Sequence, residues 1–307
     1  MRSVVKQPER AFTNIGGGFV RKPAAFQSFL IAILTALSLI MLAPLIHILS
    51  VSLSSPLYAQ AKLVYFWPKG LQFAVYKKII SMDEMWRAMG VSVYITVIGT
   101  LITLALTSMI AYSLSRATMP GRIWIMRLIV LTFILPAPLI PGFLLVKSLH
   151  MLDTLWSLMI PGATSAFYVI IMRTFFRNVS GELFDAAKMD GCGEAGIYFR
   201  VVLPLSTAVI ATIGLFHAVY QWNTYFSALV FIRDKTLYPL QVLLQNLVAK
   251  KGLNNFMGEV QFELNMPVTP EMMSAGIIIF ATVPILIVYP FLQRYFVKGA
   301  MLGSLKE

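Results

Sequence analysis

Acidic side chains gather in one short segment of an otherwise basic chain. Lysine and arginine number 25, aspartate and glutamate 13, and the net charge is +12. Four of the thirteen acids lie within residues 180–206: Glu182, Asp185, Asp190 and Glu194. They flank two adjacent small side chains, Ala186 and Ala187, which allow another backbone to approach closely. Charge around a small-residue contact predicts a surface that docks on another protein, and we assign no catalytic residue in it.

The other residue types that carry chemistry are scarce. The single cysteine, Cys192, excludes a disulfide framework and a cysteine metal cluster. The histidines are three and scattered (His47, His150 and His217), so we expect no metal site. The glycine run 16–18 lacks the Lys-Ser/Thr that a phosphate loop needs, and a flexible hinge is its simplest interpretation.

The acidic segment predicts a short helix that ends at a glycine corner. Ser180 is a plausible N-cap, and Glu182 in the first turn suits the helix dipole. Gly191 and Gly193 end the helix in a turn that needs a positive φ. The apolar positions expected on one side of this helix are Leu183, Ala186, Ala187 and Met189.

A second helix is expected to follow the glycine corner. It begins near Glu194, and its apolar positions are Ile197, Phe199, Val201 and Val202. Leu203-Pro204 is expected to stop it, since proline restricts the residue before it. A membrane-surface linker is the competing interpretation, but such helices carry Lys and Arg on their polar face, whereas this one carries acids.

The rest of the chain has the composition of a membrane protein. Hydrophobic residues make up 58% and charged residues 12%, about half the usual charged share of a globular domain. A span needs about 20 mostly apolar residues. Six runs qualify: Phe29–Val51, Val91–Leu114, Ile123–Val146, Leu155–Phe175, Leu205–Val230 and Met273–Phe296.

The distribution of basic residues sets the orientation. With the N-terminus in the cytoplasm, most of the 25 basic residues fall in the inner connections and tails, which places both termini inside. Basic residues at span ends set topology, so the net charge does not indicate a nucleic-acid partner. The segment 63–78 is aromatic, with a turn at Pro68-Lys69-Gly70, and predicts a loop plus a short amphipathic helix at the outer interface; a simple aromatic belt is the alternative.

These runs divide the chain into four regions. Residues 1–28 form a cytoplasmic tail, 29–84 the first span and an outer loop, 85–297 the transport domain, and 298–307 a cytoplasmic C-terminal tail. The expected fold is an all-α integral membrane protein of six transmembrane helices, with the acidic segment between the fourth and fifth.

Prolines interrupt the third run at Pro136, Pro138 and Pro141. Proline removes a backbone donor, and irregular backbone at membrane depth is tolerated inside protein or beside a water-filled cavity. The break therefore predicts either a kink that lines a pathway or a bend needed for packing.

The fifth run ends in a polar and aromatic cluster, formed by His217, Gln221, Trp222, Asn223 and Tyr225. Positions 217, 221 and 225 are expected to share a helix face. Polar residues in spans usually face the interior, so the cluster could contact a substrate. Contact with a sister subunit or with a binding protein is left open.

The acidic segment resembles the EAA loop of ABC importer permeases. The matching residues are Asp185-Ala186-Ala187, Asp190-Gly191, Ile197 and Leu203-Pro204. Asp185 stands where the family usually has glutamate, and Val201 where it has isoleucine. Trp222-Asn223 and the run 237–240 resemble the carbohydrate-uptake, MalG-like branch. The resemblance covers roughly residues 85–300.

The resemblance implies a type I ABC importer fold in the bacterial inner (cytoplasmic) membrane, with the segment as a coupling helix. The implied partners are a second permease subunit, two ATPase subunits, an extracytoplasmic solute-binding protein and a sugar or oligosaccharide. The chain itself would bind no cofactor and hydrolyse nothing, because ATP and Mg²⁺ belong to the ATPase subunits.

Two other functions compete with a sugar importer. One is an importer of the same class for a peptide, phosphate or amino acid. The other is an ion-coupled secondary transporter, which would need charged residues near the bilayer midplane. None lies well inside the six runs, so the sequence disfavours it.

Overall fold

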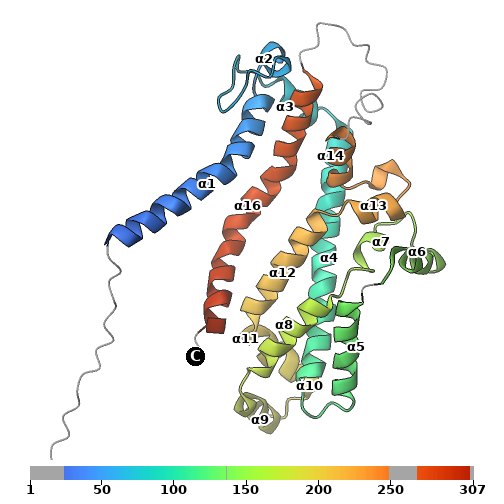
Figure 1. The fold of residues 1–307 in the computed structure, drawn as a ribbon. Coiled ribbons are helices and arrows are strands. Elements are labelled where there is room, and N and C mark those ends of the chain that lie inside the picture. Colours follow the sequence, from blue (N-terminus) through green and yellow to red (C-terminus); the bar gives the residue numbers. More distant parts are fainter. Residues whose placement is uncertain (1–23, 136, 249–267, 305–307) are drawn as a thin grey trace, which may run out of the picture. The chain divides into compact units, whose positions relative to one another are not determined.

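The computed structural model describes residues 24–135, 137–248 and 268–304 of the chain, and all regular structure in these ranges is helical (Figure 1). The chain divides into two compact units, Met1–Ile46 and His47–Glu307. The first contains most of α1 (Ala24–Ser52). Its stretch Phe26–Ser52 is long and apolar enough to cross a membrane.

Two more helices of the second unit are long enough to span: α4 (Asp83–Ser115) and α16 (Pro270–Ser304). A bend of 116° separates α5 (Arg122–Ile134) from α6 (Leu139–Ser148), and one of 79° lies before α12 (Thr207–Trp222). By length and composition, the described residues thus hold three helices able to cross a membrane, or up to five if each bent pair forms one span. The all-helical membrane fold is confirmed at this level.

Two of the predicted continuous runs are broken in the structure. The fourth run, Leu155–Phe175, becomes α7 (Trp156–Met159) and α8 (Ala166–Arg177). Pro161-Gly162 lies in the break, where proline lacks a donor and glycine favours non-helical backbone. The fifth run ends its helix at Trp222, and the chain resumes as α13 (Phe226–Phe231).

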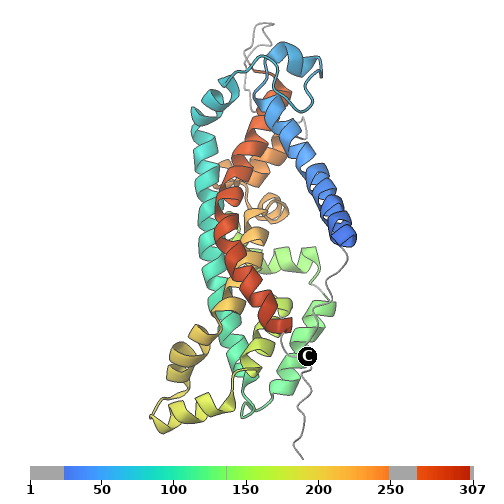
Figure 2. The ribbon, with the colours of Figure 1, turned by 90° about the vertical axis from the view of Figure 1, so that its left-hand side faces the viewer.

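Helix α4 runs along the second unit, and α8 and α12 pack against it (Figure 2). Near its start, the Ser92 hydroxyl accepts a hydrogen bond of 2.8 Å from the backbone N–H of Leu240. This contact satisfies a free donor at the first turn of α14 (Leu240–Val248), in the manner of a helix cap. Beyond α13, a 3₁₀ turn (Lys235–Leu237) leads into α14.

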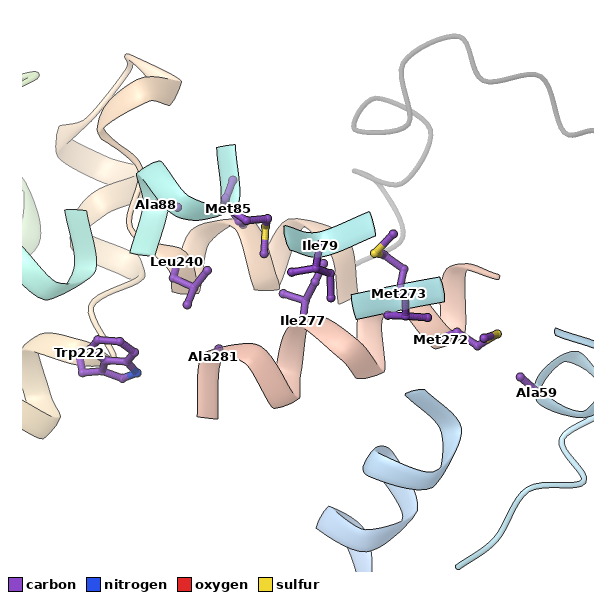
Figure 3. Close-up of a cluster of buried hydrophobic side chains, with 12 residues drawn as sticks. Ala59, Ile79, Met85, Ala88, Trp222, Leu240, Met272, Met273, Ile277 and Ala281 are labelled. Atoms are coloured by element: carbon purple, nitrogen blue, oxygen red, sulfur yellow. The ribbon is translucent and has the colours of Figure 1, made fainter. Parts of the chain in front are cut away.

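A buried apolar cluster joins α3 (Ala74–Ile80), α4, α14 and α16 near the Asp83 end of α4 (Figure 3). Gly276 of α16 lies directly against α3, because a Cβ there would overlap Val75 and stand 3.0 Å from Cδ1 of Ile79. Both side chains are fully buried. The close approach of α16 to α3 therefore depends on this glycine.

The loop and short helix predicted for segment 63–78 are present, and their place on the outer side of the membrane stays a prediction. A turn at Pro68-Lys69-Gly70, with Gly70 at φ +68°, precedes α3, and α2 (Pro56–Gln60) lies before it. The loop folds back on the end of α1, where the Ser50 hydroxyl donates to the carbonyl of Phe66 at 2.7 Å.

Candidate docking site and buried polar residues

The acidic segment forms two helices around a glycine corner, as the sequence predicts. They are α9 (Gly181–Met189) and α10 (Glu194–Ile197). The Ser180 hydroxyl caps α9 by accepting from the N–H of Glu182 at 3.3 Å. Gly191 has φ +77°, and Gly193 has an extended backbone. The corner lies at the end of the second unit opposite α14 (Figure 1).

The four apolar positions predicted to lie on one side of α9 do not share a side in the structure. Phe184 and Ala187 are buried in a cluster with residues of α4, α8 and α12. Leu183 and Met189 are 44% and 89% exposed, and Ala186 is exposed too. The helix has two apolar stripes, one through Leu183 and one through Phe184. The stripe through Phe184 faces the protein's own core. Ala186 and Ala187 therefore lie on different faces.

The second helix is longer than predicted. A π-helical turn, Tyr198–Val202, follows α10 and leads into α11 (Leu203–Leu205). Pro204 lies within this continuous helical run and does not stop it. Instead the chain bends at Ser206, the residue before α12. Ile197 and Val202 are fully buried, whereas Phe199 is 63% exposed.

Glu194 anchors the corner to α4. Its carboxylate accepts from the hydroxyl of Tyr112 at 2.7 Å and lies 3.3 Å from a guanidinium nitrogen of Arg116 and 3.7 Å from Nζ of Lys188. The Tyr112 hydrogen bond holds the pKa of Glu194 below its ordinary range, and the two cations act in the same direction. Sequence reasoning missed Tyr112 and Arg116 because they lie about 80 residues away, and no local pattern points to them.

The polar cluster of α12 is partly buried within the chain. Nε2 of His217 lies 3.0 Å from the hydroxyl of Thr103, and Nε2 of Gln221 donates to the carbonyl of Leu158 at 3.0 Å. Trp222 is buried too. These contacts make His217 and Gln221 part of the interface that α12 forms with α4 and α7.

Asn223 and Tyr225 lie beyond the end of α12, so position 225 does not share the face of 217 and 221. Asn223 is exposed, and its Nδ2 donates to the carbonyl of Val219 at 2.8 Å. Tyr220, which sequence reasoning did not select, is 57% exposed on the same helix. Pro138 is exposed at the start of α6, whereas Pro136 lies outside the described residues.

Replacing Gln221 with alanine should destabilise the protein. The change leaves the buried Leu158 carbonyl without its donor, which costs about 1–3 kcal/mol, and empties space against Gly99. We expect a lower melting temperature in detergent. Asn223→Ala is the matched amide control, because its side chain is exposed and bonds only its own helix. Equal melting temperatures for the Gln221→Ala and Asn223→Ala proteins would contradict a structural role for the Gln221 hydrogen bond.

A carboxylate joins two connections at the Asp83 end of the unit. Asp153, at φ +60°, accepts from the N–H groups of Asp234 at 2.8 Å and Arg233 at 2.9 Å. The hydrogen bond from the backbone of Asp234 contributes most to lowering the pKa of the exposed Asp153 carboxyl, and that from Arg233 contributes next. A lowered pKa means that the folded state favours the charged form, so the stabilisation is present at neutral pH and is lost as the pH falls through the lowered pKa.

Asp153→Asn should therefore lower the melting temperature at pH 7, with a gap to wild type that narrows as the pH falls into the acid range. Asparagine tolerates positive φ and keeps an acceptor, so the variant removes only the charge. Melting curves between neutral pH and about pH 3, below the ordinary aspartate pKa, measure this. A gap that does not depend on pH would assign the loss to geometry.

Comparison with known proteins identifies the class of this chain. Residues 118–301 match the family model of the binding-protein-dependent transport system inner membrane component. The chain belongs to that family of transport permeases and is an inner-membrane protein.

Individual relatives extend the match to nearly the whole chain. A polygalacturonan/rhamnogalacturonan transport system permease, YtcP of Bacillus subtilis, is 40% identical over 93% of this chain and 99% of its own length. Protein LplC of the same organism is 38% identical over 86% and 88%.

Solved structures agree with these relatives. A chain of a bacterial ABC transporter involved in the import of the acidic polysaccharide alginate has a TM-score of 0.83 at 31% identity, covering 91% of this chain and 99% of that one. A chain of the alginate transporter in complex with an alginate pentasaccharide-bound periplasmic protein shares the fold, with a TM-score of 0.55 at 12% identity.

Proposed function

We propose that this chain is one permease subunit of an ATP-driven importer for acidic oligosaccharides. One observation carries the proposal: the chain matches, over nearly its whole length, a permease for polygalacturonan and rhamnogalacturonan and a subunit of an alginate importer. Polygalacturonan and alginate are both polymers of uronic acids. The shared chemistry of these solutes, a sugar chain that carries carboxylates, is the proposed substrate class.

The charges at the Asp83 end of the second unit suit such a solute. Exposed basic side chains occur between α2 and α3, in the last turn of α6 and between α13 and α14, namely Lys62, Lys69, Lys147, Arg233 and Lys235. Asp153, one of the acids in the same region, is already engaged by two backbone N–H groups. A surface with excess positive charge raises the local concentration of an anionic solute.

In the membrane, we place the Asp83 end outside and the acidic segment in the cytoplasm, with both termini inside. Six spans result if α7 and α8, joined across Pro161-Gly162, together form the fourth. The transport domain remains 85–297, between the N-terminal regions 1–28 and 29–84 and the tail 298–307. A second permease subunit completes the pathway, and a sugar-loaded extracytoplasmic protein supplies the solute, as the solved alginate complex contains one.

The exposed face of α9 is the proposed contact with the cytoplasmic ATPase. It presents Glu182, Asp185, Ala186 and Asp190 beside the apolar side chains of Leu183 and Met189. Ala187 and Ile197 support this face from within, and Gly191 sets the angle of the corner. ATP and Mg²⁺ are bound by the ATPase subunits, and this chain needs no cofactor.

The solute pathway is proposed to pass the end of α12 and the break before α6. Asn223, at the end of α12, and Pro138, just before α6, are both exposed, as is Tyr220 of α12. His217, Gln221 and Trp222 are proposed to support this wall from behind, with Tyr225 at its outer edge.

Reconstitution of the complete transporter tests the substrate class. The complex, with its ATPase subunits and binding protein in proteoliposomes, should hydrolyse ATP several-fold faster with oligogalacturonate or oligoalginate than with a neutral maltooligosaccharide of equal length. Equal stimulation by the neutral sugar would refute selectivity for acidic chains. Stimulation by a peptide or phosphate alone would refute a sugar importer.

A further inference from the structure

Glu194 differs from the other three acids of the segment. The carboxylates of Glu182, Asp185 and Asp190 are exposed and make no ion pair or hydrogen bond among the described residues. Both ion pairs found in the described part of the chain involve Glu194, with Arg116 and with Lys188. The acids of the segment thus divide into three that face outward and one that is bound to the chain itself.

The partners of Glu194 lie at the end of α4. The Tyr112 hydroxyl donates to one carboxylate oxygen at 2.7 Å, and Arg116, which caps α4, lies 3.3 Å from the other. Lys188, in the last turn of α9, lies 3.7 Å from that same oxygen. One carboxylate therefore connects α4, α9 and α10.

Further contacts hold the same elements together. The Arg116 guanidinium lies 4.1 Å from the ring centroid of Phe184, the buried aromatic of α9. The hydroxyl of Tyr198, in the π-helical turn, is 2.7 Å from that of Ser108 in α4. Higher along α4, Thr103 contacts His217 of α12. Polar contacts thus run from the acidic segment through α4 to the helix that ends beside Asn223.

We infer that Glu194 is a coupling residue, which joins the docked corner to the inner end of α4 so that the two move as one body. This rests on the proposed function, because it needs α9 to be the element that the ATPase displaces. Three hydrogen-bonded or ionic contacts on one carboxylate resist a shear between α9 and α4 that apolar packing alone would allow. Loss of the carboxylate should leave α9 docked but loosely joined to α4.

Spin-label distances test this without any solute. In a Cys192→Ser background, labels replace two exposed methionines, Met109 of α4 and Met189 of α9. Distances are measured in the complete complex, without nucleotide and after trapping with ATP and vanadate. Wild type should give one narrow distribution that is the same in both states. Glu194→Gln should at least double its width, and Tyr112→Phe should broaden it less.

Two further variants make the result specific. Glu84→Gln, the same chemical change on an exposed side chain at the other end of α4, should match wild type. The double variant Glu194→Arg with Arg116→Glu reverses the ion pair. It should give a narrower distance distribution than either single reversal. A general loss of structure would make the double variant at least as broad as the single ones. Widths in Glu194→Gln and Tyr112→Phe equal to wild type, or a double reversal as broad as the singles, would overturn the inference. Failure of the ATPase subunits to co-purify with wild type would instead refute the proposed function.

Discussion

Replacing Gly191 with leucine should reduce solute uptake about tenfold or more. Gly191 has φ +77°, and a Cβ there would meet nothing within 4 Å, so the cost is backbone strain and not a clash. A side chain in the left-handed region costs roughly 1–2 kcal/mol, and each 1.4 kcal/mol is about tenfold in an equilibrium. The corner relieves this strain by changing the angle between α9 and α10, which misplaces the proposed docking face.

Uptake into proteoliposomes and ATPase activity, measured on the same preparation, check this prediction. Gly191→Asn is the matched control, because asparagine tolerates positive φ, and it should retain most of the transport. Normal coupling of ATP hydrolysis to uptake in the leucine variant would show that the angle of the corner does not matter.

Replacing Gly276 with leucine should abolish accumulation of folded protein. The new Cβ would overlap Val75 and lie 3.0 Å from Ile79, and both residues are fully buried in the cluster of Figure 3. Overpacking by even a few methylenes costs about 1–3 kcal/mol, and here α16 must move away from α3 to admit four carbons.

Fluorescence size exclusion of detergent extracts measures this loss. Gly90→Leu serves as the control, since Gly90 is an exposed glycine of α4 whose Cβ would meet nothing within 4 Å. The control should run as a single peak at wild-type yield. A Gly276→Leu protein that does the same would mean that α16 does not pack against α3 in the membrane.

Local features of the acidic segment could be predicted from the sequence, whereas its contacts could not. Ser180 caps the helix and Gly191 turns the backbone within a few residues of their own positions, so the residue types alone were enough to predict both features. The prediction that Leu183, Ala186 and Ala187 share one side of α9 was wrong, because Phe184 and Ala187 form the buried side and contacts with α4 and α8 select it. Arg116 became visible only when folding brought it to Glu194.

The membrane spans show the same division. Apolar content located the runs, but it does not report where backbone hydrogen bonds fail. Pro161-Gly162 breaks the fourth run and Asn223 ends α12 inside the fifth. The predicted polar cluster is divided in the structure, because α12 ends at Trp222, and His217 and Gln221 find their partners in Thr103 and Leu158, which are distant in sequence.

We propose that a partner ATPase drives this permease through the exposed face of α9. A single cysteine in place of Met189, in the Cys192→Ser background, carries a photoactivatable cross-linker in the purified complex. Met189 is 89% exposed in the isolated permease chain. We predict a covalent product of permease and ATPase subunit, and none from a cysteine at Met109 on α4. A complex that hydrolyses ATP but yields no such product from position 189 would contradict the account.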